Sequence, residues 1–152
     1  MIRILRAPFE AFFAKRKVKN IRIAPGPESE PNAQAIELEF QDGGPFLLLA
    51  IQLDGESIEA GVGRWDTSVA QFSARCPSEL ASFIGQTLQT IEMLVDLTQD
   101  IPFPDASGTS RTQRYLAARL AFSSGMLHYG NDGDIGIWSV GNPGPFVDFQ
   151  RC

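Results

Sequence analysis

The sequence predicts an α+β fold, in which an antiparallel β-meander is combined with an N-terminal amphipathic helix, one central helix and a C-terminal β-hairpin. Three observations support this prediction. Alternating apolar and polar residues between 35 and 63 indicate strands, apolar residues at helical spacing in two other segments indicate helices, and 14 glycines with 10 prolines indicate many turns. A length of 152 residues is typical of one domain, so we expect 1–152 to form a single domain.

An amphipathic helix is expected within residues 1–20, which include "IRILRAPFEAFFAKRK". Leu5, Phe9 and Phe12 recur at helical spacing, basic residues follow them where the helix dipole favours cations, and Pro8 limits how early the helix starts. We expect its aromatic face to pack on the core. The alternatives are contact with a membrane surface or a nucleic acid, or burial between two copies of the chain in a homo-oligomer.

Three strands from about residue 35 to residue 63 form the clearest part of the predicted fold. "KNIRIA" precedes them as a short strand, and the proline-rich segment 25–32 is a loop. "AIELEF" alternates apolar and acidic residues, "FLLLAIQL" is typical of a buried strand, and "SIEAGVGRW" is the third strand. Asp54 and Gly55 tolerate positive φ, so they predict a two-residue hairpin turn between the last two strands.

The second half of the chain is ambiguous between helix and strand. Pro77 suits a first helical turn, and we expect a central helix from about residue 78 to residue 98, although alternation over 91–97 leaves a strand as the alternative. Residues 110–125 also fit either structure, and we favour a hairpin that turns at "SSG". "DIGIWSV" predicts a further strand that Trp138 anchors to the core, and 143–152 is a tail along the body.

Composition indicates a protein of the cytoplasm. The chain has no run of 18 apolar residues, and its N-terminus lacks the continuous apolar core of a secretory signal. Cys76 and Cys152 belong to no CxxC pair, so two free thiols in a reducing compartment are favoured over a disulfide.

The stretch "SSGMLHYGNDGDIGIW" holds the chain's one histidine and is the first candidate for a metal site. An EF-hand loop that began at Asp132 would have Asp134 as its third position, but Gly136 at the fifth and Pro143 at the twelfth cannot supply the required ligands. Zinc is also unsupported, because one histidine and two distant cysteines do not form a ligand set. We expect no metal.

Catalysis and cofactor binding are weakly supported by the motifs. "FSSGM" lacks one glycine of a nucleophile elbow, and no phosphate-binding motif lies between a strand and a helix. The sequence therefore favours a non-enzymatic protein without a cofactor. The alternative is a small enzyme or ligand-binding domain with a pocket near His128, Asp132, Asp134 and Trp138.

Charge is unevenly distributed along the chain. Residues 1–24 hold seven basic residues and one acidic residue, whereas 25–108 hold fourteen acidic and two basic residues. Alternation against apolar neighbours is expected to direct the strand carboxylates to solvent. The resulting acidic face comprises Glu37, Glu39, Asp54, Glu56 and Glu59.

An acidic face attracts basic partners. The favoured function is therefore a protein-binding module, such as an immunity-type or inhibitory protein that neutralises a basic toxin or nuclease, or a small secretion chaperone. A pI near 4.8 argues against nucleic acid as the partner.

Overall fold

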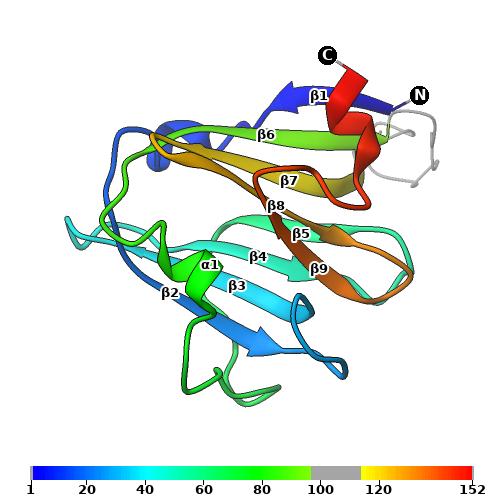
Figure 1. Cartoon of the computed structure of the whole chain (residues 1–152), viewed down its shortest axis with the longest axis horizontal. Coiled ribbons are helices and arrows are strands. Elements are labelled where there is room, and N and C mark those ends of the chain that lie inside the picture. The colour runs from blue at the N-terminus through cyan, green and yellow to red at the C-terminus, as the bar shows by residue number, and fades with distance from the viewer. Residues whose placement is uncertain (1, 97–113, 152) are drawn as a thin grey trace, which may run out of the picture.

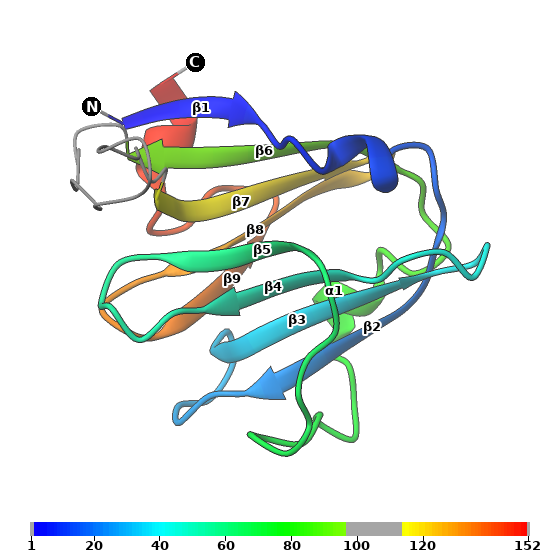
Figure 2. The same cartoon turned by 180° about the vertical axis from the view of Figure 1, so that it is seen from behind.

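The computed structural model describes residues 2–96 and 114–151, and these form two antiparallel β-sheets packed face to face (Figures 1 and 2). The first sheet has the order β1 (Ile2–Arg6), β6 (Leu88–Asp96), β7 (Arg114–Phe122), β8 (Gly125–Asn131) and β9 (Gly136–Val140). The second has the order β2 (Val18–Pro25), β3 (Ala33–Phe40), β4 (Leu47–Ile51) and β5 (Ile58–Val62). Short helical turns occur at Glu10–Phe12, in α1 (Ser78–Ala81) and at Val147–Arg151.

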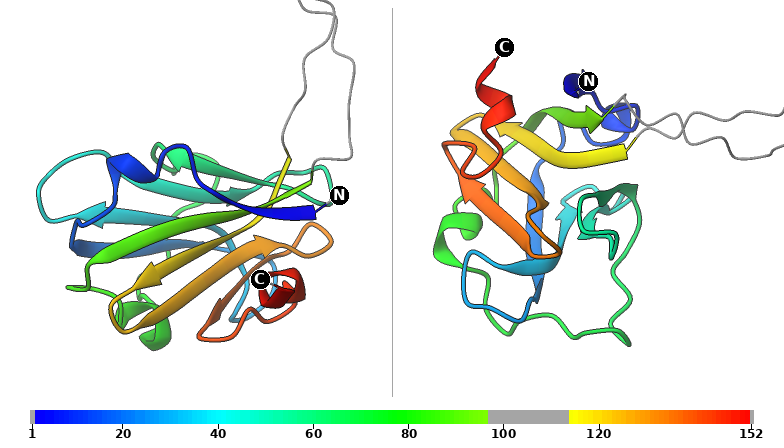
Figure 3. Two further views of the ribbon diagram at one scale, coloured as in Figure 1. Left: turned by 90° about the horizontal axis from the view of Figure 1, so that it is seen from above. Right: turned by 90° about the vertical axis from the view of Figure 1, so that its right-hand side faces the viewer.

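The predicted α+β class is wrong, because 48% of the structure is strand and 8% is helical, and the described residues contain no helix of seven or more residues. Two meanders, β2 to β5 and β6 to β9, account for eight strands, and β1 extends the second meander by pairing with β6. Figure 3 shows the two layers from above and from the side. Since each layer has one face to bury against the other, the fold is a β-sandwich.

The core lies between the two layers and is filled by alternate residues of both sheets. Phe13 stacks on Phe40 with ring centroids 5.4 Å apart, and Phe83 stacks on Phe122 at 4.5 Å. Tyr129 of β8 is fully buried, and its hydroxyl donates to the carbonyl oxygen of Ala33 at 2.7 Å, which ties one sheet to the other. Burial raises the pKa of this phenol, so Tyr129 stays a donor throughout the physiological range.

The N-terminal amphipathic helix is absent. Residues 2–6 are strand β1, one helical turn follows at Glu10–Phe12, and β2 begins at Val18. "IRILR" alternates as well as it fits a helical face, and antiparallel pairing of β1 with β6 satisfies its backbone groups on that side. The hypothesis that an amphipathic helix at 1–20 joins two copies of the chain therefore has no helix to support it.

The central helix is also wrong beyond its first turn. α1 ends at Ala81, Gly85 follows at φ +85°, a backbone conformation that continues neither helix nor strand, and β6 begins at Leu88. The apolar alternation at 91–96 therefore predicts this segment better than its helical spacing does, because the segment is a strand that places every second residue in the core. The predicted end of the helix at 98 lies outside the described residues.

Several other predictions are confirmed. β3, β4 and β5 form the antiparallel meander expected at 35–63, and β7 pairs with β8 in the expected hairpin across Ser123 and Ser124. Residues 110–113 of that segment lie outside the described part of the chain. The loop between β4 and β5 spans 52–57 rather than two residues, and Gly55 supplies the positive φ of +84°.

Irregular segments cover the outer faces of both sheets. Trp65 packs on the small outer side chains of the second sheet, where Ala24, Ala35 and Ala50 are buried. At the other end of the sequence, Phe146 and Phe149 pack on the outer face of the first sheet. The predicted tail thus lies along the body, and neither sheet has a fully solvated face.

Two further predictions concern membrane-spanning segments and the two cysteines. None of the described helices is long and apolar enough to cross a membrane. Cys76 is a half-buried free thiol, and burial together with nearby Glu30 raises its pKa. Cys152 lies outside the described residues.

Candidate functional site

The predicted acidic face is not solvated at its centre, Glu37. Glu37 has an exposed fraction of 0% and accepts hydrogen bonds from Arg22 Nη1 at 3.2 Å, Arg64 Nη2 at 3.3 Å and the Trp65 backbone N–H at 2.8 Å. Glu39, on the same face, accepts a bond from Arg22 Nη2 at 2.9 Å. The prediction that Glu37 faces solvent is therefore wrong.

The reason lies in the strand register and in a long loop. Arg22 is directly opposite Glu37 in the β2–β3 pair, where charges of opposite sign attract each other. The loop after β5 then brings Arg64 and Trp65 over the same carboxylate. A buried carboxylate with these partners is a structural ion pair, because it has no access to a ligand in solution.

Asp54 and Glu56, from the predicted acidic face, lie instead on the β4–β5 loop at one end of the sandwich. Asp54 accepts hydrogen bonds from the backbone N–H groups of Glu56 at 3.0 Å and Ser57 at 2.8 Å, and from the Ser57 hydroxyl. Burial disfavours its charged form, but these bonds and the nearby guanidinium of Arg114 outweigh burial and lower the pKa of Asp54 to about 2. Asp54 therefore orders its own loop.

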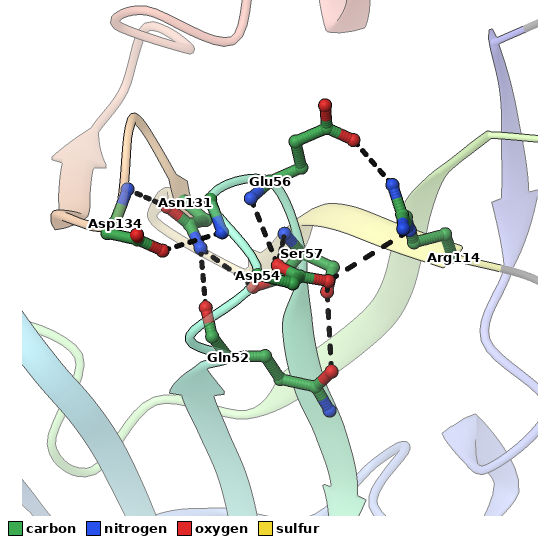
Figure 4. A network of polar contacts seen from close by, with 8 residues as sticks. Gln52, Asp54, Glu56, Ser57, Arg114, Asn131 and Asp134 are labelled. Atoms are coloured by element: carbon green, nitrogen blue, oxygen red, sulfur yellow. Dashed lines mark hydrogen bonds and ion pairs between the residues drawn. The ribbon is translucent and has the colours of Figure 1, made fainter.

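The β8–β9 turn contacts the β4–β5 loop through Asn131 and Asp134. Asn131 Nδ2 donates to the carbonyl oxygens of Gln52 at 3.0 Å and Ser57 at 2.9 Å, while its Oδ1 accepts the backbone N–H of Asp134 at 2.7 Å. Asp134 Oδ1 in turn accepts the backbone N–H of Gly55 at 2.7 Å. Figure 4 shows how these contacts join the two loops.

The geometry of the β8–β9 turn follows from its sequence. Gly133 and Asp134 have φ of +65° and +67°, and Asp132 and Ile135 exchange backbone hydrogen bonds across them. Two central residues with positive φ define the tight turn that matches the twist of a hairpin, and glycine and aspartate are among the residues that tolerate it. The predicted "GNDGD" turn is confirmed.

A cleft of about 430 Å³ opens beside these two loops. Its polar lining includes four carboxylates from four different segments: Glu56, Asp96, Asp132 and Asp148. Its apolar lining comes from Leu94, Leu116, Pro145 and Phe146. We call this site the acidic cleft.

The charges of the acidic cleft are only partly balanced. Arg114 lies beside it, with Nη1 2.5 Å from Glu56 Oε2 and Nε 4.0 Å from Asp54 Oδ2. Asp132 is exposed and makes no ion pair with a residue of the described ranges. A cation that enters the cleft would therefore meet at least one carboxylate without a cationic partner.

His128 and Trp138, which the sequence groups with Asp132 and Asp134, lie elsewhere. His128 is buried under Phe149, with ring centroids 5.5 Å apart, on the outer face of the first sheet. Burial first, and the charge of Arg119 second, lower the pKa of His128 to about 4. Trp138 points into the core, as expected of a residue that anchors its strand.

The acidic cleft thus unites residues from two separate predictions, because Glu56 comes from one set and Asp132 from the other. Asp54 and Asp134, one from each set, do not line the cleft but order the two loops beside it. The sequence did not indicate Arg114 or Asn131 as members of the site, since neither stands out by periodicity or motif. Glu59 stays exposed on β5 and does not line the cleft. Among the described residues, no group of three or more His, Cys, Asp or Glu side chains is arranged to hold a metal ion.

The chain was compared with protein-family models, curated proteins and solved structures, and none of them matches it.

Proposed function

We propose that this chain is a non-enzymatic binding module that receives a basic side chain of a protein partner in the acidic cleft. The observation that carries the proposal is the cleft itself, where carboxylates from four segments surround an apolar wall. An arginine or lysine side chain has the matching chemistry, because its alkyl stem can contact Phe146 and Leu116 while its charged end meets the carboxylates.

Size and position support a protein partner. The volume of about 430 Å³ is within the range of sites that enclose a small group, and the cleft lies at an end of the sandwich where loops leave it accessible. Negative potential at such a site accelerates encounter with a basic surface. An inhibitor of a basic toxin or nuclease, or a small secretion chaperone, would use the cleft in this way.

The partner-binding surface that we propose differs from the sequence hypothesis in its members. Asp54 and Glu56 remain at the site, Asp54 as the residue that orders the loop and Glu56 as a lining carboxylate. Glu37 is left out because it is buried, and Glu39 because it lies beside Glu37 in the same ion-pair cluster.

The test is a titration of the isotope-labelled full chain with the peptide acetyl-Gly-Arg-Gly-amide, followed by NMR. We expect the backbone amide signals of Asp132 and Gly133 to shift, and the shift to weaken as salt is added. Asp132→Asn should weaken binding by about fivefold or more. Glu59→Gln, a matched loss of one carboxylate outside the cleft, should leave binding unchanged.

Two outcomes would overturn this proposal. One is equal binding of acetyl-Gly-Glu-Gly-amide, which would show that the cleft does not select a cation. The other is much tighter binding of the free amine agmatine than of the arginine peptide, which would favour the alternative of a small-molecule-binding domain.

A further inference from the structure

A second hollow, of about 490 Å³, lies at the other end of β9, beyond Val140. Its lining residues are Glu30, Pro31, Glu79, Trp138, Ser139, Val140 and Asn142. It shares no lining residue with the acidic cleft, which lies beside the turn that precedes β9. We call this second site the β9 hollow.

Strand β9 is the last strand of its sheet, so one side of its backbone has no neighbouring strand in the sheet order. The Trp138 N–H points to that open side, because it donates to the carbonyl oxygen of Pro31 at 3.0 Å. Gly141 N–H points the opposite way, to Met126 O of β8. Since the direction of backbone groups alternates along a strand, Val140 N–H must also point to the open side.

The segment whose Pro31 carbonyl accepts the Trp138 N–H does not extend as far as Val140. Residues 31 and 32 lie antiparallel to β9, with Asn32 opposite Ile137, and Asn32 Nδ2 donates to the Gly136 carbonyl at 2.8 Å. Before Glu30 the chain belongs to the loop that follows β2, and no group in the described part of the chain accepts the Val140 N–H. Glu30, Pro31 and Val140 all line the β9 hollow, so the hollow borders the part of β9 that this segment leaves unpaired.

Two exposed carboxylates and one buried tryptophan line the β9 hollow. Glu30 and Glu79 are exposed, and neither makes an ion pair with another described residue. The indole Nε1 of Trp138 has no hydrogen-bond partner among the described residues, although only 4% of this residue is exposed. This Nε1 lies within the core cluster, so the indole is not itself a contact for a ligand, but its signal reports on binding at the hollow that Trp138 lines.

We propose that the β9 hollow binds an extended segment of a protein partner by strand addition. The backbone carbonyl of that segment accepts the Val140 N–H, and a lysine or arginine side chain lies between Glu30 and Glu79. Main-chain bonds at a sheet edge provide affinity in this mode, and the flanking carboxylates select basic sequences.

The experiment uses the labelled full chain and the peptide acetyl-Val-Lys-Val-Lys-Val-amide at millimolar concentration. The two tryptophans give two indole N–H signals, and the Trp65 indole is an internal control because it already donates to Ala70 O at 2.7 Å. We expect the Trp138 indole and the Val140 amide to shift, and hydrogen exchange of the Val140 amide to slow. The Trp65 indole should not move.

Two variants separate the contributions. The double variant Glu30→Gln, Glu79→Gln should weaken peptide binding by about tenfold, whereas Glu59→Gln should not change it. Val140→Pro removes the edge donor but no bond to β8, so it should abolish the peptide-induced shift of the Trp138 indole while the remaining spectrum stays that of a folded protein.

The proposal is overturned if neither the Val140 amide nor the Trp138 indole responds to the peptide, or if acetyl-Val-Glu-Val-Glu-Val-amide binds equally well. These outcomes are independent of the acidic cleft, because the cleft is monitored at the Asp132 and Gly133 signals. A response at the cleft signals alone supports the proposed function and refutes the β9 hollow as a peptide site.

Discussion

The outer faces of the two sheets each bury an ionisable side chain beside arginine, with opposite results. On the second sheet, Arg22 and Arg64 contact Glu37, so charges of opposite sign attract each other in a buried site. On the first sheet, His128 is buried near Arg119, and a protonated imidazole would be repelled. A guanidinium group therefore pairs with a carboxylate on one face and disfavours a charged imidazole on the other.

The largest expected effect separates the buried pair from an ordinary surface pair. Glu37→Gln removes the charge that Arg22 and Arg64 face, and we expect the free energy of unfolding to fall by about 3–4 kcal/mol. Glu39→Gln, on the same strand but partly exposed, should cost about 1 kcal/mol or less. Urea unfolding of both variants checks the difference, and equal losses would contradict a structural role for Glu37.

The opposite face should respond to acid. Because the folded-state pKa of His128 is about 4, below the ordinary 6.5, the unfolded chain binds a proton that the folded protein does not bind in this interval. Stability therefore falls as pH drops from 6.5 to 4, by about 3 kcal/mol from this residue alone. Urea unfolding at several pH values measures the slope.

His128→Leu provides the control for this pH dependence. The variant lacks the titrating group, so its stability should vary less between pH 6.5 and pH 4 than that of the natural chain. Above about pH 8 His128 is almost entirely unprotonated in both states, and there the difference between the two proteins should be constant. Parallel curves over the acid range would show that His128 is not the origin of the loss.

A smaller loss of stability is expected when the charged residue lies on a loop, as Asp134 does, than when it lies on a strand. Asp134→Ala removes the acceptor of the Gly55 N–H and places a residue that disfavours positive φ at +67°. We expect a loss of about 1–2 kcal/mol. Asp134→Asn retains an acceptor oxygen and tolerates this φ, so it should lie close to the natural chain in thermal unfolding. If both variants lose the same amount, the contact with Gly55 is unimportant.

The smallest effect sharpens the contrast between a buried and an open carboxylate. Asp132→Asn makes the same chemical change as Glu37→Gln, but Asp132 is exposed and has no ion pair among the described residues. We expect its stability to change by about 0.5 kcal/mol or less, while binding of the arginine peptide weakens. A large loss of stability would indicate that Asp132 supports the fold instead of the cleft.

Local patterns predicted those parts of the site that depend on turn chemistry. Asp54 and Gly55 were correctly placed in a turn, and so were Gly133 and Asp134, because residues that tolerate positive φ occur together there. Their meeting in one cleft was not predictable. Arg114 contacts Glu56 across 58 positions of sequence, and no local pattern indicates such a pair.

The failures at 1–20 and 78–98 have a common physical reason. In both segments apolar residues fit a helical face and a strand face about equally well, so local propensity does not decide between them. β1 and β6 are each other's partners in the same sheet, and pairing between segments more than 80 positions apart selects the strand.

By itself, the sequence determined the short-range features: the alternation that makes β3, β4 and β5 a meander, and the turns in which glycine and aspartate accept positive φ. Only the tertiary structure decided which alternate residues are buried. A strand has two faces, and a segment distant in sequence, such as the one that carries Trp65, can cover the second. Solvent exposure, ion pairing and the binding surface are therefore properties of contacts that no local pattern contains.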